Sequence, residues 1–368
     1  MTRVLIAADA VGGVWQYSLE LAGGLQRLGF EPLIALLGPA PSEVQRTEAR
    51  GLRLIETGLP PEWLAPDPDT ARRTAAALAQ LARRERADLF HAAGGACLAG
   101  VRPDLAVVAV QHSCVASWWQ AVRGGRLPAD FAWRTALVRE GLAAADAVVA
   151  PSRAFADTVE ALYDCPVRAI HNGRTQRPLC PMAPDDSIFT AGRLWDEGKD
   201  LATLDAAAGR LAVPVHAAGP LEAPHGGRIA LANIHWLGRL GAEEMRARFA
   251  RRPVFVSTAR YEPFGLAVLE AAAAGCPLIL SDIPTFRELW DDAALFVPPG
   301  DAAGFAAAIE GLVGDDLRRA ILGRRARRRA GRYSAERMAA ATAGLYRSLL
   351  GDAPAAGAGR SLGMAGVA

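Results

Sequence analysis

Short apolar segments alternate with longer amphipathic segments along most of this sequence, and this alternation constrains the fold more than any other feature. The short segments are typical of buried parallel strands, and the amphipathic ones are typical of the helices that connect such strands. We therefore expect repeated βαβ units. The predicted strands cover residues 4–8, 32–37, 88–92, 105–110, 147–150, 167–170, 188–191, 213–217, 234–237, 254–257, 278–280 and 295–297.

Several of the predicted helices have recognisable ends. The first has Val14, Tyr17 and Leu21 on one face, and Gly29 follows it at a position where helices commonly end. For the helix predicted over residues 70–86, Asp69 is the expected N-cap. The remaining predicted helices cover residues 201–210, 242–249, 266–274, 302–312, 315–330 and 334–349.

The alternation is interrupted once, at residues 171–184, where the sequence HNGRTQRPLCPMAP is polar and rich in proline. We interpret this segment as a linker between two α/β domains, residues 1–172 and residues 173–333. A helix over residues 334–350 follows, and residues 351–368, which are rich in glycine and alanine, are expected to form a flexible tail. The length of 368 residues fits this division, because domains contain roughly 100 to 200 residues.

Composition excludes several classes of protein. Hydrophobic residues make up 51% of the chain and the net charge is only +2, which excludes a disordered chain and argues against nucleic acid as the main partner. The apolar segments are far shorter than the ~20 residues that span a bilayer, and residues 4–8 are too short for a secretory signal. We therefore expect a cytoplasmic protein. The five cysteines and six histidines show no metal-ligand spacing, so no metal site is expected.

Two α/β domains that face each other form a cleft at the carboxyl ends of their strands. Open α/β sheets bind ligands at this edge, and the helix N-termini there favour phosphate. The predicted architecture therefore points to a ligand that resembles a nucleotide, although the fold alone does not determine the chemistry.

The densest functional signal is the segment YEPFGLAVLE, which follows a predicted strand and opens a predicted helix. Gly265 allows the backbone to approach a ligand, so the N–H groups of residues 264–266 are expected to form an anion site. Glu262 precedes the helix, and Glu270 follows eight residues later, about 12 Å along a helix axis. This spacing suits two carboxylates that hold different hydroxyl groups of one extended ligand. An ordinary helix-start acid and a solvated glutamate are an equally good interpretation.

A second signal is the segment GRLWDEGK. Arg193 and Lys199 flank this loop, so both are expected to point at one diphosphate, arginine as a planar fork and lysine as a point charge. Lys199 is the only lysine of the chain, which favours a functional role. The alternative is that the two cations pair with Asp196 and Glu197 at the surface.

Weaker signals occur at four other places. Gly12 and Gly13 lie between the first strand and helix without a complete glycine fingerprint, and His112 follows a strand, where it either contacts a sugar hydroxyl or bonds to backbone. Asp67-Pro68-Asp69 fits a helix start better than a metal site. Two further segments each allow two interpretations. The pair Trp118–Trp119 either packs as ordinary side chains or faces an acceptor. The arginine-rich stretch from Arg318 to Arg332 is either a solvated helix face or a contact with anionic lipid.

Taken together, these segments resemble the family 4 glycosyltransferases, which are retaining, nucleotide-sugar-dependent enzymes of the GT-B fold. The resemblance covers residues 4 to about 350, and its most specific parts are EPFGLAVLE and GRLWDEGK, in the expected order. The weaker matches are VGGVWQYSLELAGGL, VVAPS, AIHNG and IHWLGRL. His171 departs from the family pattern, in which a proline is frequent at this position.

The resemblance implies a role for each candidate residue. His112 and Glu262 are expected to be catalytic, with His112 near the anomeric centre and Glu262 on the transferred sugar. It also implies that no metal or other cofactor is needed, and that the helix over residues 334–350 returns to the first domain. The remaining implied contacts are the donor diphosphate for Arg193, Lys199, Gly13, Gly265 and Leu266, the donor sugar or ribose for Phe264 and Glu270, and the nucleobase for Arg239 and Leu240.

The leading hypothesis is a transferase that moves a hexose from a nucleotide-diphosphate sugar to a glycan, a lipid-linked acceptor or a small molecule. Two alternatives keep the fold, namely a nucleotide-sugar epimerase or hydrolase and a catalytically inactive sugar-binding protein. A nicotinamide dehydrogenase is disfavoured, because the first turn lacks both the glycine fingerprint and the ribose-binding acid.

Overall fold

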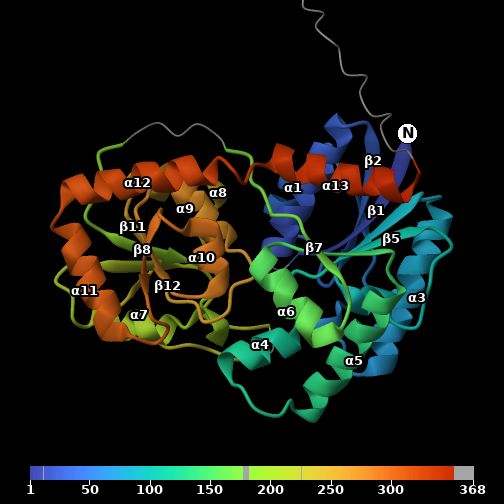
Figure 1. Ribbon diagram of the computed structural model, residues 1–368, viewed down its shortest axis with the longest axis horizontal. Helices are drawn as coiled ribbons and strands as arrows, with labels where there is room; N and C mark the ends of the chain where they lie inside the picture. Colours follow the sequence, from blue (N-terminus) through green and yellow to red (C-terminus); the bar gives the residue numbers. More distant parts are fainter. Residues whose placement is uncertain (11, 177–181, 225, 352–368) are drawn as a thin grey trace, which may run out of the picture.

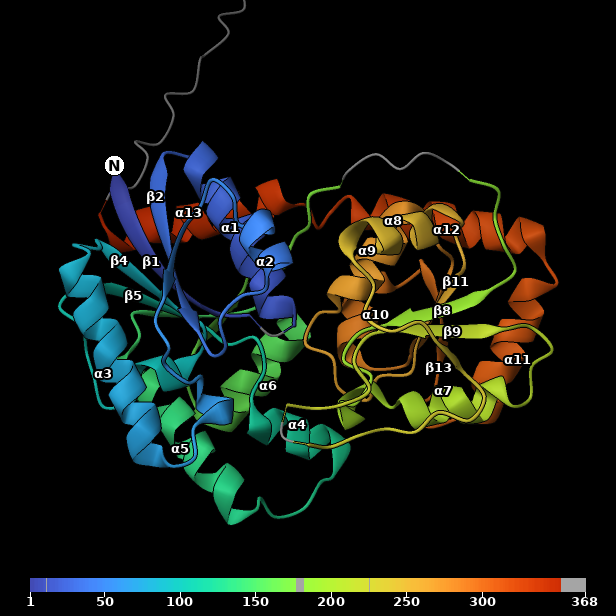
Figure 2. The same ribbon diagram turned by 180° about the vertical axis from the view of Figure 1, so that it is seen from behind.

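The structure is a computed structural model that describes residues 1–10, 12–176, 182–224 and 226–351. It contains two parallel sheets that lie side by side, each covered by helices (Figure 1, and Figure 2 from behind). This arrangement confirms the predicted α/β class with two Rossmann-like units. Among the described residues, every helix is too short or too polar to span a bilayer.

The first sheet has the strand order β3-β2-β1-β4-β5-β6-β7, with every neighbouring pair parallel. β1 lies between β2 and β4, and its residues from Thr2 to Asp9 pair in register with Phe30 to Leu37 of β2. The strands of this sheet are β1 (Thr2–Asp9), β2 (Phe30–Leu37), β3 (Arg53–Glu56), β4 (Leu89–Ala92), β5 (Ala106–Val110), β6 (Ala147–Ala150) and β7 (Val167–Ala169).

The second sheet has the order β10-β9-β8-β11-β12-β13 and is also parallel throughout. The two central strands, β8 and β11, each end in a loop that carries predicted site residues. The strands are β8 (Ile188–Ala191), β9 (Val215–Ala218), β10 (His235–Trp236), β11 (Val254–Ser257), β12 (Leu278–Ser281) and β13 (Ala294–Val297).

Helices connect the strands, as the sequence pattern predicts. Those of the first half are α1 (Gly13–Arg27), α2 (Glu43–Glu48), α3 (Pro68–Arg84), α4 (Val115–Val122), α5 (Ala129–Ala144) and α6 (Arg153–Tyr163). Those of the second half are α7 (Leu201–Ala208), α8 (Ala242–Ala250), α9 (Leu266–Ala274), α10 (Pro284–Trp290), α11 (Ala302–Val313), α12 (Asp316–Ala330) and α13 (Ala335–Leu349). Three single 3₁₀ turns lie at Glu62–Leu64, Gly95–Leu98 and Glu197–Lys199.

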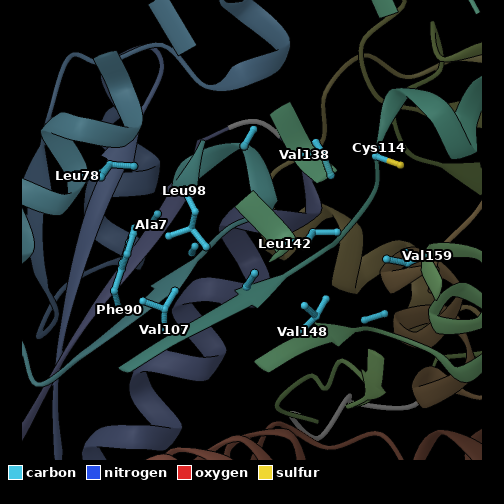
Figure 3. Packing of buried hydrophobic residues seen from close by; sticks show 14 of the residues in the cluster. Ala7, Leu78, Phe90, Leu98, Val107, Cys114, Val138, Leu142, Val148 and Val159 are labelled. Carbon is cyan, nitrogen blue, oxygen red and sulfur yellow. The ribbon is translucent and has the colours of Figure 1, made fainter. Parts of the chain in front are cut away.

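Successive residues of each strand face opposite sides of the sheet, so both faces are apolar and both are covered. In the first sheet, Leu5 and Ala7 of β1 face α3, α5 and α6, while Val4 and Ile6 face α1 and α13. Figure 3 shows the first of these layers, in which Leu78, Val138 and other side chains from the helices pack against the strands. The second sheet is covered in the same way, with α8, α9, α10 and α12 on one face and α7 and α11 on the other.

The last helix, α13, leaves the second sheet and packs on the first. Its Met338, Ala339 and Tyr346 lie in one core with residues of α1 and β1. The approach to α1 is so close that a Cβ on Gly24 would lie 2.4 Å from Cβ of Ala339. In Figure 1, α12 and α13 run one after the other across both halves of the molecule.

The sequence prediction differs from the structure in two respects. The N-cap of α3 is Asp67 rather than Asp69, because Oδ1 of Asp67 accepts a hydrogen bond from the N–H of Thr70 at 2.6 Å and Pro68 begins the helix. The prediction also omitted β3, α2, α4, α5, α6 and α10. The predicted tail from position 352 onward and residues 177–181 of the predicted linker lie outside the described residues, so these two expectations stay predictions.

Candidate active site

Loops from the carboxyl ends of both sheets meet between the two halves of the molecule. The loop after β1 brings Gly12 so close to the loop after β8 that a Cβ on Gly12 would lie 3.0 Å from Nη1 of Arg193. Gly12 also has a φ of 80°, which side chains disfavour. A Cβ on Gly13 would lie 3.3 Å from Cδ1 of Leu266, the first residue of α9. Gly13, which is predicted to lie near the diphosphate, therefore faces the start of α9, and its neighbour Gly12 faces the Arg193 loop.

Arg193 is held by a nearly buried carboxylate. Oδ2 of Asp196 accepts a hydrogen bond from Nη2 of Arg193 at 2.9 Å, and the Asp196 side chain is only 8% exposed. Burial opposes ionisation of Asp196, but the charges of Arg193 and Lys199 outweigh burial and hold the pKa of Asp196 below its usual value. The carboxylate is therefore ionised and fixes the guanidinium at the edge of the loop.

Lys199 points to the loop that follows β11. Its Nζ forms an ion pair with Oε2 of Glu262, and both side chains are mostly enclosed, at 23% and 14% exposure. Glu197, which the surface-pair alternative assigned to these cations, instead pairs with Arg123 at 2.6 Å. The surface-pair alternative is therefore correct for Arg193, which pairs with Asp196, but wrong for Lys199, which pairs with Glu262.

The start of α9 has the conformation expected of a backbone anion site. Gly265 has a φ of 91°, and no side chain in the described part of the chain caps the first turn of the helix. Phe264 is buried against His171 and Tyr333, so only its backbone is available to a ligand. Ser152 of the first half donates a hydrogen bond to the carbonyl of Pro263 at 2.8 Å and so supports this loop. The N–H groups at this helix start carry the positive end of the helix dipole.

Glu270 lies one turn further along α9 and contacts a residue that sequence reasoning missed. Its Oε1 is 2.8 Å from Nη2 of Arg174 in the crossing segment between the sheets. The same guanidinium donates to Gln16 and contacts Glu20 on α1. Burial raises the pKa of Glu270, and Arg174 opposes this shift. The two glutamates of the EPFGLAVLE segment therefore lie in different surroundings, Glu262 beside Lys199 and Glu270 beside Arg174 and α1.

His112 follows β5 and is the predicted site residue of the first sheet. Its ring meets the ring of Tyr17 edge-on, at 4.4 Å between centroids. Burial lowers the pKa of His112 to about 4, so its imidazole is neutral near pH 7. Behind it, the buried His91 bonds to the hydroxyl of Tyr17 at 3.3 Å and to that of Tyr346 at 2.6 Å. A residue of α13 therefore supports the aromatic contact that holds His112.

The predicted nucleobase loop is joined to the Arg193 loop through Gly219. Arg239 is exposed and Leu240 is half-buried in the loop after β10. Gly219 donates its N–H to the carbonyl of Gly238 at 2.8 Å, and a Cβ on Gly219 would lie 1.9 Å from the carbonyl oxygen of Gly192. Only glycine allows these loops to lie together.

Trp118 and Trp119 are half-buried rather than free at the surface. Both rings meet Phe131 edge-on, and Nε1 of Trp118 donates to Oδ1 of Asp196 at 3.0 Å. The residues between Arg318 and Arg332, in contrast, include several exposed arginines, although Arg319 is buried and pairs with Asp186.

Models of known protein families match this chain. The family model described as "Glycosyltransferase Family 4" matches residues 11–175, and the model described as "Glycosyl transferases group 1" matches residues 228–329, so the two together cover most of the chain. The chain belongs to the family 4 glycosyltransferases. This confirms the family that the EPFGLAVLE and GRLWDEGK segments indicate.

Two curated relatives illustrate the range of this glycosyltransferase family. The O-antigen chain mannosyltransferase B of Escherichia coli is 32% identical over 116 residues, which are 32% of this chain and 30% of that protein. A glycogen synthase of Mycobacterium tuberculosis is 36% identical over 114 residues, 30% of this chain and 28% of that protein. The matches therefore span less than a third of the length of these relatives.

Solved structures resemble this glycosyltransferase over nearly its whole length. The sucrose-phosphate synthase of Thermosynechococcus elongatus aligns with a TM-score of 0.79 at 20% identity, covering 95% of this chain and 100% of that one. HepE of Anabaena, in complex with UDP and glucose, aligns with a TM-score of 0.70 at 16% identity, with coverage of 95% and 100%. These likenesses confirm the GT-B fold.

Proposed function

We propose that this family 4 glycosyltransferase moves a hexose from a nucleotide-diphosphate sugar to the hydroxyl of a glycan, lipid-linked or small-molecule acceptor, with retention of configuration and without a metal ion. The observation that carries the proposal is the convergence of Arg193, Lys199 and Glu262 beside the uncapped start of α9 and the glycine pair after β1. Two cations close to one helix N-terminus suit a diphosphate.

In the proposed reaction the protein acts through position and charge. The acceptor oxygen forms a bond to the anomeric carbon on the face from which the diphosphate leaves, and a phosphate oxygen takes the acceptor proton. Arg193, Lys199 and the N–H groups at Gly265 and Leu266 stabilise the charge that develops on the leaving diphosphate. Glu262 holds a sugar hydroxyl through the oxygen that Lys199 leaves free, and we assign the neutral His112 to the side of the anomeric centre.

Nucleotide binding tests the proposal directly. We expect one of UDP, GDP and ADP to raise the melting temperature with concentration, because a ligand at 100 times its Kd stabilises the folded state by about 2.7 kcal/mol. EDTA is expected to leave this shift unchanged. If none of the three diphosphates stabilises the protein, the donor site is wrongly assigned. Rapid loss of the donor sugar without any acceptor would favour the hydrolase or epimerase alternative.

We also propose a cytoplasmic location at the inner membrane face, with the exposed arginines of α12 and the adjoining Arg332 against anionic lipid. The proposal is supported by six exposed guanidinium groups that form no ion pair with a carboxylate among the described residues. Vesicles with anionic phosphatidylglycerol are expected to sediment the protein, and neutral phosphatidylcholine vesicles are not. Equal sedimentation with both would contradict the proposal. The six residues are Arg318, Arg324, Arg325, Arg327, Arg328 and Arg332.

A further inference from the structure

Helix α4 of the first half contacts both donor loops of the second half. Nε1 of Trp118 donates to Asp196 at 3.0 Å, and the hydroxyl of Ser117 is 2.8 Å from that of Tyr261, the residue before Glu262. Arg123 at the end of the helix pairs with Glu197. Three contacts from one short helix therefore fix the two loops that carry Arg193, Lys199 and Glu262.

The Trp118 contact is the most informative of the three, because Asp196 is shared. Oδ1 of Asp196 accepts hydrogen bonds from Trp118 and from the N–H of Gly198 at 2.9 Å, while Oδ2 accepts from Arg193. A carboxylate held by three donors has one orientation, and it presents Oδ2 to the guanidinium. Loss of the indole donor frees the carboxylate to rotate, and Arg193 then loses its fixed position.

Gly198 leaves the space beside Asp196 that the indole of Trp118 occupies. A Cβ at this position would lie 3.0 Å from Nε1 of Trp118 and 3.1 Å from Oδ1 of Asp196. Any side chain here would displace the tryptophan or the carboxylate. The close contact with Trp118, 80 positions earlier in the chain, therefore explains why the GRLWDEGK segment has a glycine at position 198.

We infer that Trp118 is a positioning residue for the donor diphosphate: it acts across the two domains, through Asp196, on Arg193. The inference rests on the proposed function, since it assigns Arg193 to the diphosphate. It follows that the second domain alone does not complete the donor site. Arg193 is held in position to bind the diphosphate only while α4 of the first domain lies against the Arg193 loop.

The test compares Trp118→Phe with Trp119→Phe. Both indoles pack edge-on against Phe131, but the buried Nε1 of Trp119 has no hydrogen-bond partner among the described residues, so its loss is a matched control for ring size. We measure Kd for UDP, GDP or ADP, whichever the wild type binds, and for the matching monophosphate. Trp118→Phe is expected to weaken the diphosphate about tenfold, the effect of one hydrogen bond to a charged group. The monophosphate, and both ligands with Trp119→Phe, are expected to change less than about twofold.

A second variant disturbs the contact between Trp118 and Asp196 by a substitution in the second domain. Gly198→Ala crowds both Nε1 of Trp118 and Oδ1 of Asp196, so it strains their hydrogen bond without removing the indole. We expect the same selective loss of diphosphate affinity, and this variant also carries the test if Trp118→Phe does not fold. Equal behaviour of the Trp118 and Trp119 variants, or equal losses for diphosphate and monophosphate, would overturn the inference. Failure of the wild type to bind any diphosphate would instead refute the proposed function.

Discussion

Replacing Lys199 with alanine is expected to lower kcat/KM for the donor by about a hundred- to a thousandfold, the range typical for loss of one charge-stabilising group in an active site. The substitution has two additive consequences. It removes one of the two cations assigned to the diphosphate, and it leaves the carboxylate of Glu262, only 14% exposed, without its ion-pair partner. An unpaired carboxylate beside the diphosphate then repels the ligand.

The double variant Lys199→Ala with Glu262→Gln separates these consequences. If repulsion by Glu262 contributes, the double variant binds the nucleotide diphosphate more tightly than Lys199→Ala alone, although it remains slow in turnover. Arg260→Ala is the matched control, because Arg260 is a nearby cation that pairs with Asp200 instead. We expect less than a threefold change for it. Calorimetric Kd values and initial rates provide the readouts, and wild-type turnover by Lys199→Ala would refute the assignment of Lys199.

Replacing Tyr346 with alanine is expected to lower the free energy of unfolding by about 3–5 kcal/mol, the usual cost of removing a large buried aromatic ring. Tyr346 lies on α13 and is fully buried, where its ring meets Phe30 edge-on and its hydroxyl bonds to His91. The substitution therefore leaves a cavity between α13 and the first sheet, and it removes one of the two hydroxyl groups that bond to the buried imidazole of His91.

Tyr346→Phe is the control for the hydroxyl alone. It keeps the ring, so we expect a cost of only about 1–3 kcal/mol, the penalty for one buried polar group left without its partner. Urea unfolding followed by far-UV circular dichroism measures both values. If the alanine variant is as stable as the wild type, α13 does not contribute to the stability of the first domain in solution.

The strands and the two donor loops could be predicted because they depend on local sequence. Buried parallel strands are continuous apolar segments, and the sequence shows them at nearly the observed positions, for example Ile188–Ala191 and Val254–Ser257. The position of Gly265 before α9 is likewise a local signal, since a positive φ next to a helix start favours glycine. Helix α5 was missed because its buried face includes Arg134 and Gly141, which interrupt the apolar periodicity.

The contacts of the candidate site were harder to predict, because they join residues that are distant in sequence. Proximity suggested Glu197 as a partner of Lys199, but the structure pairs Lys199 with Glu262, 63 residues away. The contact of Trp118 with Asp196 crosses between the domains, and that of Arg174 with Glu270 joins the segment between the sheets to α9. Such pairs depend on how distant segments pack, and no periodicity or local motif encodes that arrangement.

The return of α13 to the first domain determines how parts of this protein can be exchanged with those of a relative. The polypeptide passes between the domains twice, and the two passages touch, since the N–H of Arg174 donates to the carbonyl of Tyr333 and the N–H of Ala335 to that of Arg174. A chimera that keeps the first domain intact therefore requires two splice points, one near Gly173 and one near Ser334. A single junction would graft a foreign terminal helix onto α1, where Gly24 and Ala339 leave no room for a mismatched side chain.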